Sequence, residues 1–239
     1  MNTPTANTLS EVRAGVAAIL PAVIAMIPFA LILGQQAASK GLTPLEVLAM
    51  SSIVFAGSAQ MLAISLWTEP APIAALTLSA LLVNLRHVLM GASIASKMAP
   101  FDRWRAPAAF LMTDEHWAVA ERRALGRPLT LAFWLGSSVF LFLAWQAVTV
   151  LGAVFGSFIR DPERYGFDFA FPAMFIALAL GFWKGWRTAP VMAASGLVAT
   201  AVHATAPGAW YIIAGALAGI AVAVALDTGA KPDVGKVRA

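Results

Sequence analysis

The sequence contains no cysteine and few charged residues. Without cysteine, the chain can form neither a disulfide bond nor a metal site built on thiolates. Asp, Glu, Lys and Arg make up only 12% of the residues, apolar residues make up 60%, and the mean hydropathy is +0.78. A soluble domain of this length has too much surface for so few charges. The composition therefore excludes that class and indicates a membrane protein.

Long stretches without charge indicate where the chain crosses the bilayer. No Asp, Glu, Lys or Arg occurs in residues 14–39, 47–68, 70–85, 128–159, 169–183 and 188–226. Because about 20 apolar residues span the hydrocarbon core, most of these stretches hold one helix, and the last holds two. We therefore predict an all-α, polytopic membrane protein with about seven spanning helices, some of them discontinuous. The predicted spans are 14–36, 45–67, 71–95, 129–154, 168–186, 188–204 and 209–226.

The segment between the third and fourth spans is ambiguous. Residues 106–120 are moderately apolar but short, so they fit a short eighth span, a re-entrant piece or an interfacial helix. Counting Lys and Arg with seven or with eight spans predicts a cytoplasmic C-terminus, while the two counts disagree about the N-terminus. No cleavable signal is recognisable. Residues 1–239 are predicted to form one transmembrane domain with polar tails at 1–13 and 227–239.

A polar segment, Asn84-Leu-Arg-His87, lies in the middle of the third predicted span. An arginine at that depth is costly, from roughly 2.5 to above 10 kcal/mol, so Arg86 is expected to be paired or to face a cavity. On a continuous helix Asn84 and His87 share one face, while Arg86 lies about 200° from Asn84. Asn84 and Arg86 can therefore line the same cavity only if this helix is broken. The alternative roles are a structural ion pair for Arg86 and an interhelical hydrogen bond for His87.

The second predicted span contains Gly57, Ser58 and, two residues later, Gln60. A Gly-Ser pair at mid-depth can interrupt a helix and free backbone groups, which is how many transporters bind their substrates. Close helix packing through small residues explains the same pair equally well. Gln60 favours a functional role, because a buried glutamine needs polar partners.

Two adjacent carboxylates, Asp114 and Glu115, are followed by His116. Side chains of neighbouring helical residues point about 100° apart, so one carboxylate can face a cavity while the other caps or pairs. A carboxyl group removed from water takes up a proton more readily, which suits proton transport. A helix end in a polar loop is the alternative interpretation.

Enzyme motifs are missing from the sequence. It contains no Walker A motif, no HExxH and no GxSxG, and no basic stretch with repeated aromatic residues. We therefore expect no enzymatic activity, no cofactor, no metal site and no binding of nucleic acid.

Three short sequences, in this order, resemble the AzlC family. They are Phe55-Ala-Gly-Ser-Ala-Gln60, Asn84-Leu-Arg-His87 with the following Leu89-Met-Gly91, and Leu111-Met-Thr-Asp-Glu115. The resemblance implies the large subunit of an AzlC/AzlD-type exporter of branched-chain amino acids. It implies the bacterial cytoplasmic (inner) membrane as the location and a small AzlD-type membrane subunit as the partner. Because no nucleotide-binding domain is present, we favour a proton-coupled secondary transporter over an ABC-type permease subunit that needs an external ATPase. A passive channel is the other alternative.

An exported amino acid presents a carboxylate, an ammonium group and an apolar side chain. We expect Arg86, or backbone N–H groups freed at Gly57 and Ser58, to hold the carboxylate. Gln60, Asn84 or the Asp114/Glu115 pair would meet the ammonium group. His87, Asp114 or Glu115 would take up protons as the substrate leaves.

Overall fold

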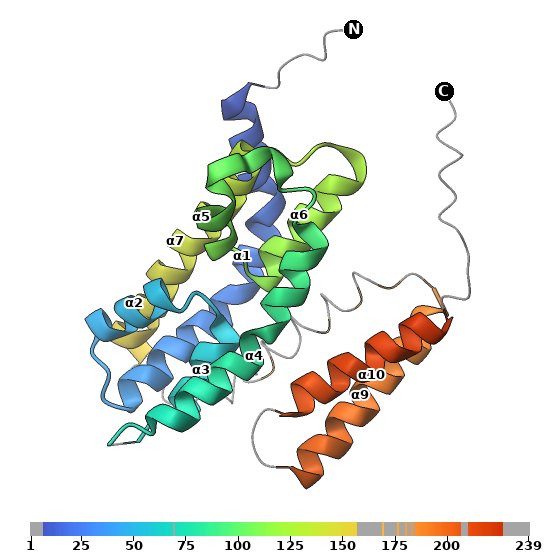
Figure 1. The fold of residues 1–239 in the computed structure, drawn as a ribbon. Helices are drawn as coiled ribbons and strands as arrows, with labels where there is room; N and C mark the ends of the chain where they lie inside the picture. The colour runs from blue at the N-terminus through green and yellow to red at the C-terminus, as the bar shows by residue number, and fades with distance from the viewer. Residues whose placement is uncertain are drawn as a thin grey trace, which may run out of the picture. The chain divides into compact units, whose positions relative to one another are not determined.

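The computed structural model describes residues 7–68, 70–156, 185–206 and 210–226, with the single residues Phe169, Ile176, Leu180 and Trp183. These residues contain helices and no strand (Figure 1). They belong to two compact units, Met1–Gly181 and Phe182–Ala239, which we describe separately. The first unit contains α1 (Thr8–Ser39), α2 (Pro44–Ile53), α3 (Gly57–Ser65), α4 (Ile73–Ile94), the 3₁₀ helix η1 (Ala99–Trp104), α5 (Arg105–Phe110), α6 (Asp114–Gly126) and α7 (Leu131–Phe155).

The second unit contains two apolar helices, α9 (Thr188–Thr205) and α10 (Trp210–Leu226), where the sequence predicts the last two spans. They pack antiparallel through small residues: a Cβ on Gly215 would lie 2.9 Å from Ala199 Cβ, and one on Gly219 would lie 3.4 Å from Ser195 Cβ. The predicted span at 168–186 lies almost entirely outside the described residues, as do the tails 1–6 and 227–239.

Three helices of the described residues are long and apolar enough to cross a membrane: α1, Leu76–Ile94 of α4, and α7. The predicted number of about seven spans is therefore not confirmed. Among the described residues of the first unit the difference arises at 45–67, because this segment forms two short helices instead of one long helix.

The frame of the first unit is the pair α1 and α7, which lie side by side (Figure 1). Glycines let the two backbones touch: a Cβ on Gly136 would lie 2.4 Å from the carbonyl oxygen of Val12, and one on Gly34 would lie 2.0 Å from that of Thr149. The first contact is near the start of both helices and the second is near their ends, so α1 and α7 run in the same direction. Such close approach is typical of helix packing in lipid.

Residues 45–67 do not form one spanning helix, because α2 and α3 fold back on each other. Gln60 Nε2 donates to Ser51 Oγ at 2.8 Å, although nine residues of a straight helix would separate them by about 13 Å. At the outer ends, Lys40 Nζ lies 3.5 Å from the carbonyl oxygen of Trp67. The chain thus enters and leaves the α2–α3 hairpin at the same end of the first unit.

A second hairpin enters from the opposite end. It consists of α5 and α6, which together extend slightly beyond the segment 106–120 for which the sequence left three interpretations open. Asp114, at the tip, contacts Arg86, which lies eight residues, or about 12 Å, before the end of α4. At the outer end of α6, Arg123 Nη2 bonds both carboxylate oxygens of Glu11 at 2.7 and 2.8 Å. Residues 106–120 thus contain a turn between two short helices, and the tip of this hairpin reaches Arg86.

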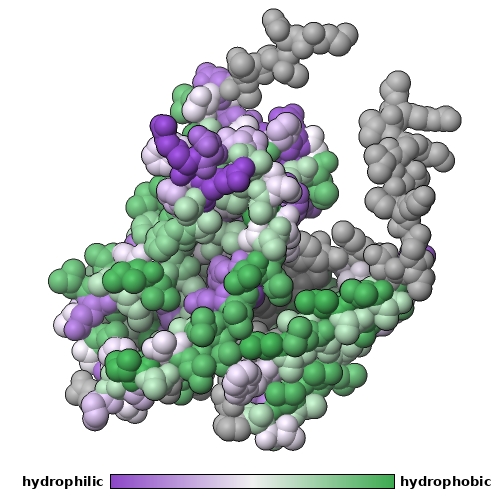
Figure 2. Space-filling model, in the orientation of Figure 1, coloured by the Kyte–Doolittle hydropathy of each residue, from purple (hydrophilic) through white to green (hydrophobic). Residues whose placement is uncertain are grey.

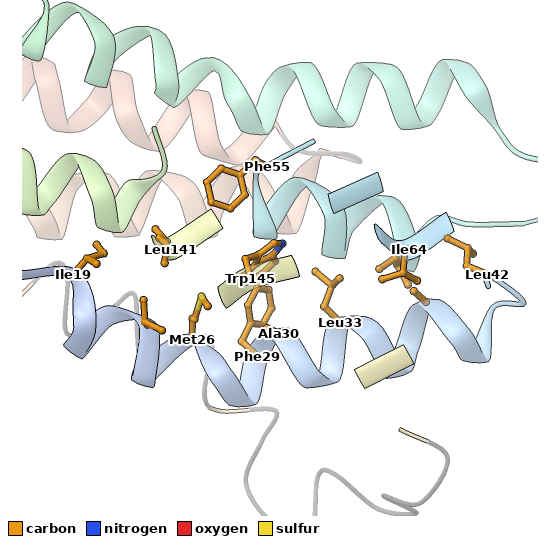
Figure 3. Packing of buried hydrophobic residues seen from close by; sticks show 13 residues of the cluster. Ile19, Met26, Phe29, Ala30, Leu33, Leu42, Phe55, Ile64, Leu141 and Trp145 are labelled. Atoms are coloured by element: carbon orange, nitrogen blue, oxygen red, sulfur yellow. The ribbon is translucent and has the colours of Figure 1, made fainter. Parts of the chain in front are cut away.

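One hydrophobic cluster fills the space between α1, α7 and the α2–α3 hairpin. In Figure 3, Phe29 and Trp145 lie against each other in its middle, and Leu42 and Ile64 meet near the outer end of that hairpin. A separate cluster, which includes Ile94, Phe101 and Trp134, packs around the α5–α6 hairpin. Each hairpin is thus held by its own part of the core.

Charge in the first unit gathers at one end. Hydrophilic side chains cover the end where η1 and α5 lie, whereas the surface over α2, α3 and α4 is mostly hydrophobic (Figure 2). The Lys and Arg residues at this end are Arg13, Lys97, Arg103, Arg105, Arg122, Arg123 and Arg127. Among the described residues, Lys40 is the one basic residue at the other end of the unit. The positive-inside tendency predicts that the basic end is cytoplasmic.

The two hairpins predict a specific accessibility pattern. The natural chain has no cysteine, so single cysteines can be placed at the exposed residues Ser39, Thr68, Ala99 and Pro128. We expect a membrane-impermeant maleimide to label Ser39→Cys and Thr68→Cys from one side of the membrane, and Ala99→Cys and Pro128→Cys from the other. Labelling of Ser39→Cys and Thr68→Cys from opposite sides would contradict the α2–α3 hairpin.

The close contact between α1 and α7 predicts a stability effect. Gly34→Ala puts a methyl group against the backbone of α7, and such overpacking costs roughly 1–3 kcal/mol. We expect a lower apparent melting temperature for this variant in detergent. Gly91→Ala on α4 is the matched control, because its new Cβ meets nothing within 4 Å. Equal melting temperatures for the two variants would mean that this contact does not limit stability.

Candidate functional site at the tips of the two hairpins

The tips of the two hairpins meet at a pocket beside α4. Its lining residues come from five helices and from the two tips. They are Met26, Phe29, Phe55, Ala56, Gly57, Ser58, Arg86, His87, Thr113, Asp114, Glu115, Leu141 and Trp145. Residues that are far apart in the sequence therefore form one site, because the hairpins bring both helix interruptions to the same depth.

Arg86 connects the two tips. Its Nη1 lies 2.8 Å from Asp114 Oδ2, and its Nη2 donates to Ser58 Oγ. The side chains of Arg86 and Asp114 are 24% and 16% exposed, so the ion pair is shielded from water without being sealed. Ser58 is in the first turn of α3 and Asp114 is the first residue of α6, so one guanidinium group holds the starts of both helices.

Both of these helices direct their N-termini at the pocket. Ala56 precedes α3 and provides no side-chain cap for the first backbone N–H groups. At α6, Thr113 Oγ1 accepts from the backbone N–H of His116 at 3.4 Å and donates to Glu115 Oε2 at 2.7 Å. Helix N-termini carry partial positive charge, and uncapped N–H groups there bind carboxylates readily. The start of α3 can therefore hold an anionic group of a ligand.

The other side of the pocket is apolar. Trp145 and Phe29 lie with ring centroids 5.8 Å apart, and Met26, Phe55 and Leu141 complete this wall. These side chains are buried. The pocket thus offers an apolar wall opposite a group of charged and hydroxyl side chains.

Gln60 lies behind this wall and is not among the lining residues. It is 1% exposed, its amide nitrogen donates to Ser51 Oγ at 2.8 Å, and its Oε1 accepts from the indole N–H of Trp145 at 3.1 Å. The polar partners that the sequence analysis expected for a buried glutamine are thus two side chains of the protein. Gln60 fastens both helices of the α2–α3 hairpin to α7.

The third predicted span is one continuous helix, α4, so the geometry expected for a continuous helix applies. Arg86 and His87 line the pocket, and Asn84 does not. Of the predicted site residues, the structure brings together Gly57, Ser58, Arg86, His87, Asp114 and Glu115. It leaves Gln60 and Asn84 outside the lining.

Seven lining residues were not among the predicted site residues: Met26, Phe29, Phe55, Ala56, Thr113, Leu141 and Trp145. Four of them are apolar residues within spanning helices, where nothing in the sequence distinguishes a pocket wall from ordinary core. Thr113 had a detectable signal, since a threonine directly before two acidic residues is typical of a helix N-cap.

The polar groups of the pocket comprise a guanidinium, two carboxylates, an imidazole and two hydroxyls. This set can bind a ligand that carries both charges, because Arg86 and Asp114 can each exchange their mutual contact for one with the opposite charge of the ligand. Within the described residues, no group of three or more His, Asp or Glu side chains could hold a metal ion.

The part of the chain that forms the pocket matches a known protein family. The model of the AzlC protein family matches residues 21–159. An uncharacterized membrane protein of Archaeoglobus fulgidus is 34% identical over 87% of this chain and 91% of its own length. The inner membrane protein YgaZ of Escherichia coli is 33% identical over 73% of this chain and 74% of its own. The branched-chain amino acid transport protein AzlC of Bacillus subtilis is 28% identical over 61% of this chain and 57% of its own. No solved structure matches.

The ion pair between Arg86 and Asp114 predicts a non-additive stability effect. Arg86→Gln and Asp114→Asn each leave a shielded charge without its partner, so we expect each to lower the apparent melting temperature. The double variant should lose less than the sum, with a coupling of roughly 1–3 kcal/mol. Thermal unfolding of the purified protein in detergent measures this. Strict additivity would show that the two charges do not stabilise each other.

Proposed function

The chain belongs to the AzlC family, and from this premise we propose that it is a transporter subunit that exports branched-chain or similar small apolar amino acids. The family is one of transport proteins, which argues against an enzyme. The observation that carries the proposal is the two-sided pocket. A free aliphatic amino acid needs a cation for its carboxylate, an anion for its ammonium group and an apolar wall for its side chain. All three occur within this pocket.

The substrate carboxylate would bind Arg86 and the uncapped N–H groups at Gly57 and Ser58. The ammonium group would bind Asp114 and Glu115. A zwitterion bound in this way replaces each half of the Arg86–Asp114 ion pair with a group of the same sign, so neither side chain is left unpaired. Binding then costs less than the insertion of a single charge into a shielded site.

Proton coupling would use the same pocket. Asp114, Glu115 and His87 all line it, so a proton taken up by one of them changes the charge that the ammonium group meets. A carboxylate that becomes neutral releases the ammonium group. Inward flow of protons can drive export of the substrate by this competition.

The partner and the membrane rest on the family, whereas the single domain rests on the sequence and the cytoplasmic C-terminus on the counts of Lys and Arg. We propose that the subunit works with a small AzlD-type membrane partner in the bacterial cytoplasmic membrane, that residues 1–239 form one transmembrane domain, and that its C-terminus is cytoplasmic. The B. subtilis relative is described as a branched-chain amino acid transport protein, and the E. coli relative as an inner membrane protein.

Transport into vesicles tests the proposal. We expect proteoliposomes that contain the chain and its co-expressed partner to move labelled leucine or valine when a pH gradient is imposed, and to stop when an ionophore collapses it. Movement that needs ATP and ignores the gradient would indicate an ABC-type permease. Non-saturable flux without coupling would indicate a channel. Vesicles with each subunit alone show whether the partner is required.

Substitution of Arg86 tests the site. We expect Arg86→Gln to abolish transport while the protein still reaches the membrane, because the substrate carboxylate loses its cation. Lys97→Gln is the matched control: Lys97 pairs with Glu121 beyond the end of α4 and does not line the pocket. Normal export by Arg86→Gln would show that Arg86 has only a structural role.

A further inference from the structure

The contact between Gly57 and Trp145 is the tightest on the apolar side of the pocket. A Cβ placed on Gly57 would lie 2.7 Å from the Cη2 atom of Trp145 and 2.9 Å from the Cε1 atom of Phe29. Ring contacts at such distances are too short for a methyl group, so one of the rings would have to move. The indole of Trp145 can therefore occupy its observed position only because Gly57, at the start of α3, has no side chain.

The same edge of the indole is also held by a hydrogen bond. Its N–H group donates to Gln60 Oε1 at 3.1 Å, and Gln60 donates to Ser51 Oγ at 2.8 Å. Gly57 and Gln60 are three residues apart on α3, so one turn of this helix contacts Trp145 at two points. Trp145 is 5% exposed, which leaves its ring little freedom to rotate.

We propose that Trp145 sets the size of the substrate side chain that the pocket accepts, with Gly57 providing its space and Gln60 positioning its ring. This rests on the function proposed above. A fixed indole limits the depth of the apolar wall, so substrates are distinguished by length and branching. Differences of one methylene group in an apolar pocket change the specificity ratio by roughly 10–200-fold.

The experiment measures initial transport rates of labelled alanine, valine, leucine and methionine in the same proteoliposomes, for the chain with its partner. Trp145→Phe deepens the pocket, so we expect the ratio of leucine to valine transport to rise by about tenfold. Gly57→Ala pushes the rings into the pocket, so the ratio should fall. Gln60→Leu frees the ring, so discrimination should weaken.

Matched controls separate specificity from damage to the fold. Trp134→Phe removes another buried indole of α7, one that donates to the carbonyl oxygen of Ala108 and does not line the pocket. Gly91→Ala adds a methyl group where nothing lies within 4 Å. We expect both to leave the leucine-to-valine ratio unchanged. If Gly57→Ala does not accumulate in the membrane, the leucine-to-valine ratio of Trp145→Phe is the result that tests the proposal.

A double variant distinguishes positioning by Gln60 from a general structural role. Phenylalanine has no N–H group for Gln60 to accept, so Gln60→Leu added to Trp145→Phe should change the ratio no further. An unchanged ratio in Trp145→Phe overturns the inference while leaving the proposed function intact. If the natural chain transports none of these amino acids, the proposed function fails and the inference fails with it.

Discussion

A guanidinium group in the middle of an apolar helix needs polar partners. The arrangement of the first unit brings such partners to Arg86 from two other helices. A charge left alone in lipid costs from about 2.5 to above 10 kcal/mol. The partners of Arg86 are a hydroxyl at the start of α3 and a carboxylate at the start of α6. Both are available because the chain interrupts its helices on either side of α4. The ion pair and the pocket thus both depend on the two interruptions of the helices.

Different parts of the first unit are held by different kinds of contact. Glycine contacts lock α1 to α7 along most of their length, and the two hairpins lie against this frame. The outer end of α6 is held by Arg123, whose guanidinium bonds Glu11 and lies 4.8 Å from the ring centroid of Phe133. The outer end of the α2–α3 hairpin is held mainly by apolar packing, as at Leu42 and Ile64. The first unit is thus a frame of two closely packed helices with two hairpins that are anchored in different ways.

Much of the candidate site could be predicted from the sequence, because charged residues are rare in apolar spans and because a Gly-Ser pair can interrupt a helix. Arg86, the Gly57-Ser58 pair and the two acidic residues were recognisable on those grounds. The path of the chain through the two hairpins could not be predicted. A hairpin of two short helices over 45–67 has the same apolar composition as one spanning helix. Only the contacts of the segment show whether the chain turns back or continues in one direction. The role of Gln60 also depended on contacts, since its partners are nine and 85 residues away.

The close contact between Gly57 and the indole of Trp145 has a genetic consequence. Every glycine codon is one base away from an alanine codon, so a single mutation can place a methyl group against the indole, which then has to move. The tryptophan codon has no such neighbour for phenylalanine, and its single-base changes give Leu, Arg, Gly, Ser, Cys or a stop codon. A single-base route to a conservative change in the apolar wall of this pocket therefore begins at the residue without a side chain.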